Sequence, residues 1–184
     1  MRFPLDFEKE VKEFSPQLCG ISSIFTADFP TTCRLSRKIK EINPDIFVFV
    51  GGHHPSLVPE DFFLKTINAI VTGEGEKTTS ELIEIICQKG DLSKVKGLAI
   101  NTNEGQIRTP PRPLIKDLDN LPFPSRSLVT ANQKRYRMFT CQPVASLETT
   151  RGCPFRCKFC SVWVFYQGKV RKKVPKEWLM KLPK

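Results

Sequence analysis

Three cysteines, Cys153, Cys157 and Cys160, lie within one stretch of eight residues and form a CxxxCxxC pattern. Thiolates at this spacing can bind three irons of a cubic iron–sulfur cluster and leave the fourth iron open. A structural zinc ion normally has four protein ligands, so zinc would need a further thiolate, for which Cys141 is the only nearby candidate. Three unrelated structural cysteines are a third interpretation, which explains the spacing least well.

A second set of candidate residues follows three predicted strands, where open α/β sheets bind their ligands. The set consists of Ser22, Ser23, Gly51, Gly52, His53, His54, Gly73, Glu74, Gly75 and Glu76. Glycine lets the backbone approach a bulky ligand, and serine hydroxyls can bond an amide or a phosphate. Plainer interpretations stay open: the glycines could form tight turns, the histidine pair could be a solvated loop instead of metal ligands, and the two glutamates could cap a helix.

Strand and helix patterns alternate through the first two thirds of the chain, which predicts an α/β fold with a parallel sheet and right-handed crossovers. The predicted strands are 17–25, 46–50 and 68–73, the predicted helices are 4–14, 31–43 and 76–90 with a short one near Pro59, and a hairpin is expected from 96–102 and 105–109. In the helix at 76–90, the residues expected to face the core are Leu82, Ile83, Ile86 and Cys87, and Gly90 is expected to end it. Cys19 and Cys33 are also expected to be small core residues.

The last third of the chain differs in composition and charge. Residues 109–127 hold five of the fifteen prolines, a density that excludes regular helix and predicts a stiff linker. An apolar strand is expected at 144–150, directly before the cysteines. Residues 1–125 hold 15 Lys/Arg and 17 Asp/Glu, a net charge of −2, whereas residues 126–184 hold 14 and 2, a net charge of +12. This asymmetry predicts two parts with different roles.

The composition excludes several classes of protein. With 40% hydrophobic and 26% charged residues, the chain falls in the globular range. It has no apolar run near the ~20 residues of a transmembrane helix, and its acidic first ten residues do not form a secretion signal. Seven cysteines, an odd number, favour a reducing compartment, so a cytoplasmic protein is expected. The basic residues 168–184 accompany no nucleic-acid-binding motif, so we expect no nucleic-acid partner.

The segment LETTRGCPFRCKFC at 147–160 resembles the cluster motif of radical S-adenosylmethionine (SAM) enzymes, with the aromatic Phe159 before the last cysteine. In that family the loop follows the first strand of a (β/α) barrel and three cysteines hold a [4Fe-4S] cluster. SAM chelates the open iron and, on reduction, yields a 5′-deoxyadenosyl radical that abstracts hydrogen from the substrate. The resemblance implies that Cys153, Cys157 and Cys160 are cluster ligands, that Phe159 contacts the SAM nucleoside, and that the partner is an electron donor of flavodoxin or ferredoxin type.

The upstream sequence resembles the cobalamin-binding subgroup of these enzymes. The likeness lies in GISSIFTADFP, RKIKEINPD, VGGHHPSLVPEDF, VTGEGEKTTSELIE and PPRPLIKDLDNLPFP, and with the cysteine motif it covers about residues 17–170. It implies an incomplete Rossmann- or flavodoxin-like cobalamin-binding domain, followed by the first strand and cluster loop of a radical SAM barrel. The implied cobalamin contacts are Ser22, Ser23, Gly51, Gly52, His53, Gly73, Glu74 and Gly75. The Asp-x-His-x-x-Gly loop of other cobalamin modules is absent, so histidine ligation of cobalt stays open.

The chain departs from the family pattern at both ends. The subgroup's cobalamin domain normally begins with a strand–helix–strand unit that this sequence lacks, and only 24 residues follow Cys160, whereas a barrel takes ~200 residues or more. We therefore expect a fragment that does not turn over alone. Its expected parts are a partial cobalamin-binding domain at 1–108, a linker at 109–127 and the start of a radical SAM domain at 128–184.

The function expected from the resemblance is radical-based C–H functionalisation, with methyl transfer through cobalamin as the favoured reaction. The substrate is expected to be a small or lipid-like molecule that the sequence does not identify. Two alternatives from other classes remain: a non-catalytic cobalamin- or nucleotide-binding module, and an interaction domain stapled by zinc on Cys141 and the three clustered cysteines.

Overall fold

The computed structural model describes residues 7–102, 105–128, 140, 144 and 146–174. The chain divides into two compact units, residues 1–114 and residues 115–184. The division falls inside the proline-rich segment, where residues 109–125 form neither helix nor strand, as their proline density predicts.

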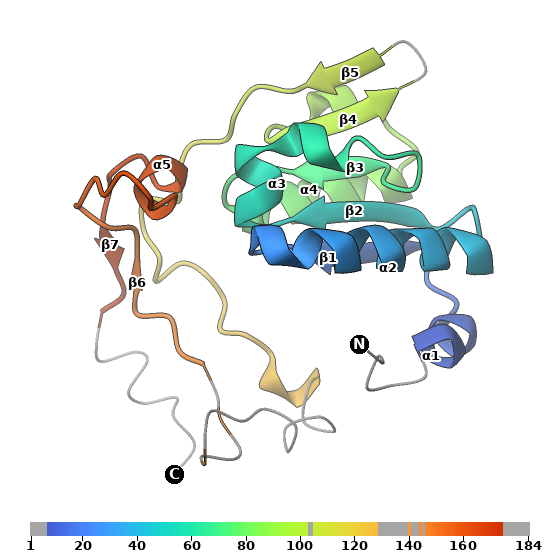
Figure 1. The fold of residues 1–184 in the computed structure, drawn as a ribbon, viewed down its shortest axis with the longest axis horizontal. Coiled ribbons are helices and arrows are strands. Elements are labelled where there is room, and N and C mark those ends of the chain that lie inside the picture. Colours follow the sequence, from blue (N-terminus) through green and yellow to red (C-terminus); the bar gives the residue numbers. More distant parts are fainter. Residues whose placement is uncertain (1–6, 103–104, 129–139, 141–143, 145, 175–184) are drawn as a thin grey trace. The chain divides into compact units, whose positions relative to one another are not determined.

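A five-stranded sheet forms the centre of the first unit (Figure 1). Its strands, in spatial order, are β1 (Leu18–Ser22), β2 (Phe47–Gly51), β3 (Ala69–Val71), β4 (Leu98–Thr102) and β5 (Gly105–Arg108). β1, β2 and β3 are parallel, whereas β4 is antiparallel to β3 and β5 is antiparallel to β4. The predicted α/β class and the predicted hairpin are confirmed, but the parallel order holds only for the first three strands.

β4 runs opposite to β3 because the chain between them leads back to the carboxyl end of β3 before β4 starts. After helix α4 (Gly75–Cys87) the chain forms a 3-10 turn, η3 (Leu92–Lys94), and then reaches the far end of β3. Leu98 lies opposite Val71, the last residue of β3, and the Thr72 N–H donates to the Gly97 carbonyl at 2.8 Å. β4 therefore begins where β3 ends and runs the opposite way.

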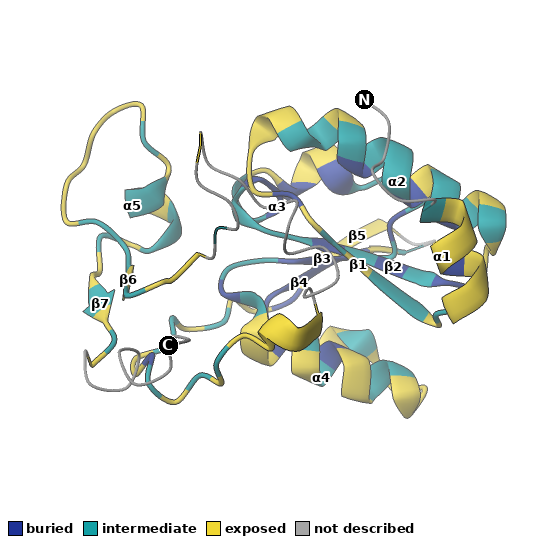
Figure 2. Cartoon of the chain, turned by 90° about the horizontal axis from the view of Figure 1, so that it is seen from below, coloured by how far each residue is buried: buried dark blue, intermediate teal, exposed yellow. Residues whose placement is uncertain are grey.

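The helices cover both faces of this sheet, with α2 (Phe29–Ile42) on one face and α4 on the other (Figure 2). The remaining helical segments of the unit are α1 (Phe7–Phe14), η1 (Thr26–Asp28), α3 (His53–Leu57) and η2 (Pro59–Phe62). β2 alternates accordingly: Val48 packs with Ile39 of α2, whereas Phe49 packs in the cluster that contains Leu82 of α4. No helix in the described part of the chain is long and apolar enough to cross a membrane.

Helix α4 buries a face that is turned relative to the one its sequence pattern predicts. Leu82 is fully buried and Ile85 and Ile86 pack against the same cluster, but Ile83 is 42% exposed and Cys87 is exposed. The expectation that Ile83 and Cys87 face the core is wrong, because residues one position along a helix are turned by about 100° from the buried stripe. The helix also ends earlier, at Cys87, and the residue with positive φ that follows it is Lys89 (φ 51°), not Gly90.

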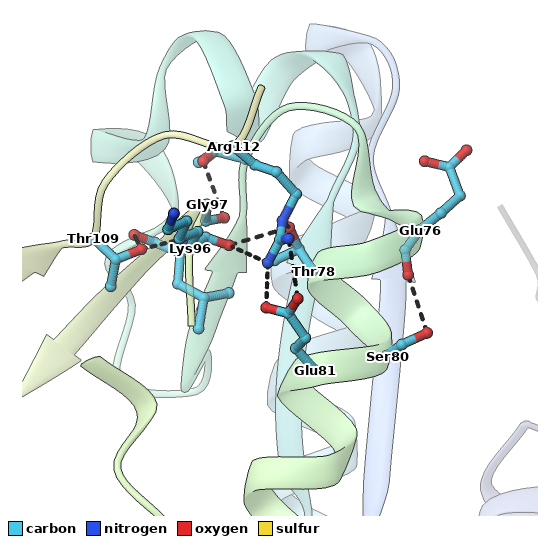
Figure 3. A network of polar contacts seen from close by, with 10 residues as sticks. Glu76, Thr78, Ser80, Glu81, Lys96, Gly97, Thr109 and Arg112 are labelled. Atoms are coloured by element: carbon cyan, nitrogen blue, oxygen red, sulfur yellow. Dashed lines mark hydrogen bonds and ion pairs between the residues drawn. The ribbon is translucent and has the colours of Figure 1, made fainter. Parts of the chain in front are cut away.

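The chain that leaves β5 is fastened back onto the first unit by Arg112 (Figure 3). Its Nε donates to Thr78 Oγ1 at 2.8 Å, and its Nη1 donates to Glu81 Oε1 at 3.0 Å. Nearby, the Gly97 N–H donates to the Pro110 carbonyl at 2.9 Å. The start of the proline-rich segment is therefore part of the first unit.

The second unit contains little regular structure in its described residues. A two-stranded sheet pairs β6 (Thr150–Arg151) with β7 (Arg171–Lys172) in antiparallel fashion, and α5 (Val162–Phe165) lies between them in sequence. The predicted strand at 144–150 is wrong for residues 146–149, which adopt no strand. A strand requires a partner for its backbone groups, and β7 pairs with only two residues.

The two faces of α4 provide a test of this packing. We expect Leu82→Ala to lower the free energy of unfolding by about 2–5 kcal/mol, because it leaves a cavity in the core. Ile83→Ala, the same kind of change one residue along, should cost less than about 1 kcal/mol. Urea unfolding of both variants, followed by circular dichroism, checks this, and equal losses would contradict the described orientation of α4.

Candidate cofactor-binding sites

The carboxyl ends of the three parallel strands meet at one edge of the sheet. The register pairs Ser22 with Gly51 and Gly51 with Val71, so the residues that follow these strands start from the same level. This alignment brings the predicted candidates Ser22, Ser23, Gly51 and Gly52 together, with Gly73 following on the neighbouring strand. A cofactor that binds beyond this edge would meet all three loops.

The loops after β1 and β2 touch through their backbones at Ser23 and Gly52. Gly52 has φ +131°, and a Cβ atom placed on it would lie 2.3 Å from the Ser23 carbonyl oxygen. The Ser23 N–H donates to the Gly51 carbonyl at 2.8 Å. Glycine is therefore required at position 52, both for its conformation and for the space.

The side chain of Ser23 is fully buried, and its Oγ has no hydrogen-bond partner among the described residues. Buried hydroxyls are normally bonded, because an unpaired one costs about 1–3 kcal/mol. This orphaned oxygen fits a site that receives a polar atom of a ligand. Ser22, in contrast, is exposed and borders an apolar pocket of about 560 Å³ between α1, β1 and α2.

Two exposed apolar side chains, Ile24 and Phe25, follow Ser23 and were not predicted as site residues. They are 47% and 68% exposed, and their N–H groups donate to the Asp28 carboxylate at 3.2 and 2.9 Å. An Asp three residues after an aromatic gives little signal in a sequence, so only the structure reveals this apolar surface beside the serine.

The loop after β3 leads into α4. Gly73 has φ +74°, and a Cβ atom on it would meet nothing within 4 Å. Glu74 is buried and occupies the N-cap position of α4, as the capping interpretation has it, but its side chain makes no capping hydrogen bond to the helix. Glu76 lies in the first turn, where the helix dipole favours an acid. Its carboxylate points away from the Arg112 network, and its carbonyl accepts a bond from Ser80 Oγ at 3.2 Å (Figure 3).

His53 and His54 lie on helix α3, so the interpretation of this pair as a solvated loop is wrong. His54 is buried: its Nε2 pairs with Asp61 Oδ2 at 2.9 Å, and its ring packs edge-on against Phe62 and Phe29. It therefore anchors α3 in the core. His53 is half-buried, and this burial lowers the pKa of its imidazole below the ordinary value. A neutral imidazole can act as a metal ligand or a hydrogen-bond acceptor.

The cysteine loop of the second unit is braced from both sides. Gly152 has φ +96°, and a Cβ atom on it would lie 1.9 Å from the Lys169 carbonyl oxygen, so glycine is required before Cys153. The Cys157 carbonyl accepts bonds from the Cys160 N–H at 3.1 Å and from Trp163 Nε1 at 3.2 Å. These contacts hold the middle of the loop against α5.

The three thiols of this loop are free, Cys157 being exposed and Cys153 and Cys160 half-buried, and Phe159 is 93% exposed. Among the described residues, no three His, Cys, Asp or Glu side chains are gathered closely enough to hold one metal ion. A zinc site needs such a group, with each sulfur about 2.3 Å from the ion. In a cubic cluster each thiolate binds a different iron, so three thiolates would leave the fourth iron open. Cys141, the fourth ligand in the zinc hypothesis, lies outside the described residues.

Residues 3–83 match the B12 binding domain family, and this range includes all the candidates at the three strand ends. The chain is 34% identical to the hopanoid C-3 methylase of Methylococcus capsulatus, over 88% of this chain and 31% of that protein. It is 37% identical to an uncharacterised methyltransferase of Pyrococcus horikoshii, over 85% of this chain and 34% of that protein. It thus spans about a third of the length of these curated relatives.

Among solved structures, the fold is similar to that of the cobalamin-dependent SAM radical enzyme OxsB with aqua-cobalamin and SAM bound. The TM-score is 0.65 at 26% identity, over 84% of this chain and 21% of that one. The chain thus carries a B12 binding domain match and is similar to radical SAM enzymes that bind cobalamin. The B12-binding match covers the first unit's parallel strands, and the cysteine loop lies beyond it.

The lowered pKa of His53 predicts a pH dependence of stability. As the pH falls from 7.5 to 5.0, the unfolded chain takes up a proton at position 53 before the folded chain does, so the folded state loses stability. We expect His53→Gln to reduce this loss, which urea unfolding at the two pH values measures. An equal loss in both proteins would contradict the described burial of His53.

Proposed function

We propose that this chain carries the cofactor-binding regions of a cobalamin-dependent radical SAM methyltransferase, with cobalamin at the carboxyl edge of the first unit. The observation that carries the proposal is the buried, unpaired Ser23 hydroxyl beside the Gly52 turn, within the region that matches the B12 binding domain. The hydroxyl would bond a polar atom of cobalamin. The absence of a side chain at Gly52 lets the loops after β1 and β2 meet, and the open space at Gly73 would let the cofactor approach the backbone there.

The cysteine loop is the proposed site of a [4Fe-4S] cluster and SAM. Cys153, Cys157 and Cys160 would bind three irons, and the exposed ring of Phe159 would contact the SAM nucleoside. When bound, the cluster and SAM would supply a radical and cobalamin would carry a methyl group. The residues of this chain would hold and orient these groups, and Trp163 would fix the carbonyl of Cys157 while they bind.

Methyl transfer is supported by the names of the two curated relatives, both methylating enzymes. OxsB is named only as a radical enzyme, so radical chemistry without methyl transfer is the second candidate. Activity is proposed for a protein of the relatives' length.

A lipid-like small-molecule substrate is supported by the name of the hopanoid methylase. We also propose an acidic electron donor of flavodoxin or ferredoxin type, because the basic charge of residues 126–184 favours such a partner. The proposed location is the cytoplasm.

The cluster proposal is tested by metal analysis after anaerobic reconstitution with iron and sulfide. We expect about four irons and four sulfides per chain, and a loss of most of this iron in Cys157→Ala, because the cluster then lacks one of its three protein ligands. Cys87→Ala is the matched control, since Cys87 is also exposed but lies on α4. One zinc per chain, or full iron in Cys157→Ala, would refute the cluster assignment.

The role of Ser23 is tested by a change that separates binding from stability. We expect Ser23→Ala to weaken the binding of hydroxocobalamin about fivefold to tenfold, yet to maintain or raise the free energy of unfolding, because it removes an unpaired buried hydroxyl. Equilibrium dialysis and urea unfolding measure the two effects.

The control for this test is Ser36→Ala. Ser36 is equally buried, but its Oγ bonds with Thr66 Oγ1 at 2.8 Å. This change should lower stability by about 1 kcal/mol or more and leave the affinity for hydroxocobalamin unchanged. If Ser23→Ala destabilises the chain and binds hydroxocobalamin normally, Ser23 is not a cobalamin contact.

A further inference from the structure

Ser56 joins the two glycine turns that follow β2 and β3. Its Oγ donates to the Gly52 carbonyl at 2.6 Å and accepts the Gly73 N–H at 3.0 Å. A hydroxyl has one hydrogen, so the donated bond to Gly52 fixes which side of the oxygen receives Gly73. The distance between the two turns is thereby set by one side-chain atom.

This bond completes a series of contacts across all three strand ends. Ser23, after β1, donates its N–H to the Gly51 carbonyl and lies against Gly52. Gly52 then connects through Ser56 Oγ to Gly73, after β3. Ser56 supplies the side-chain atom in this series, while the other contacts are between backbone groups.

The helix that carries Ser56 is held rigidly. α3 has five residues, and His54 and Pro55, the two before Ser56, are both buried. His54 is fixed by Asp61 and by the edge-on ring of Phe62 at a centroid distance of 4.9 Å. The position of the Ser56 hydroxyl is therefore fixed by α3. The two turns that bond to it are held at a separation that this position sets.

We propose that Ser56 is a positioning residue for cobalamin: it holds the Gly52 and Gly73 turns at the separation that the cofactor requires, without contacting the cofactor itself. This inference rests on the proposed cobalamin site. If the hydroxyl is removed, the half-buried Gly73 N–H loses its acceptor, and the Gly52 carbonyl keeps only the Ser56 N–H at 3.2 Å. The two turns then move independently, and binding must order them again.

The test compares Ser56→Ala with Ser80→Ala. Ser80 is the matched control, because its Oγ also donates to the carbonyl four residues earlier, that of Glu76, but links no other loop. We expect Ser56→Ala to weaken hydroxocobalamin binding about fivefold to twentyfold by equilibrium dialysis, and Ser80→Ala to change it less than twofold. Ser56→Thr keeps the hydroxyl and should restore affinity to within about threefold of the parent chain.

A second measurement examines the bridge without cofactor. Amide hydrogen exchange at Gly73, followed by NMR, should be at least about tenfold faster in Ser56→Ala than in the parent chain, and slow again in Ser56→Thr. A general loss of structure would accelerate exchange across β2 and β3 as well, so these strands report whether the variant is folded. If Ser56→Ala does not fold, Ser56→Cys replaces it in the comparison with Ser56→Thr. The thiol of Cys forms only weak hydrogen bonds, whereas the hydroxyl of Thr forms full ones.

The outcomes separate this inference from the function on which it rests. If the parent chain binds hydroxocobalamin and Ser56→Ala binds it equally well, the positioning role is overturned and the cobalamin site stands. Unchanged exchange at β2 shows that Ser56→Thr is folded. If this variant nevertheless binds hydroxocobalamin as weakly as Ser56→Ala does, the hydroxyl does not determine the affinity, and the positioning role is also overturned. If the parent chain binds no hydroxocobalamin, the proposed site and the inference fall together.

Discussion

The parallel register of β1, β2 and β3 is the constraint on which the rest of the first unit depends. Because Ser22, Gly51 and Val71 lie side by side, the three following loops emerge at one level and must share the space beyond the sheet. The backbones of Ser23 and Gly52 approach so closely that a Cβ atom on Gly52 would clash with the Ser23 carbonyl. Parallel strands need long return connections, and here α2 and the α3–η2 segment provide them on the same face.

The same constraint explains why the polar groups of this edge differ in their surroundings. The half-buried Ser56 bonds through its hydroxyl to both neighbouring turns, whereas the fully buried Ser23 hydroxyl bonds to none of the described residues. The Ser23 hydroxyl therefore leaves unused hydrogen-bonding capacity beside the Gly52 turn. This turn lies at the edge where ligands of open α/β sheets bind, within the B12-binding match.

Much of this architecture could be predicted from the sequence, because it depends on local patterns. The run Ile46–Val50 predicts a buried strand, and the spacing of Leu35, Ile39 and Ile42 predicts α2. The reversal of β4, the burial of His54 and the Ser56 bridge could not be predicted, because each depends on a partner twelve or more residues away or on a turn direction. The exposed side of α4 could not be predicted for a related reason. Four apolar residues of the helix lie on more than one of its faces, and the sheet covers only one stripe.

The central claim is that cobalamin binds at the three strand ends of the first unit, and hydrogen–deuterium exchange with and without hydroxocobalamin tests it most directly. The account predicts slower exchange in peptides that cover residues 22–25, 51–56 and 72–76, and no change in the β4–β5 hairpin, which lies at the other side of the sheet from β1. Unchanged exchange in all three loops at a saturating concentration of hydroxocobalamin, or protection confined to other segments, would contradict it.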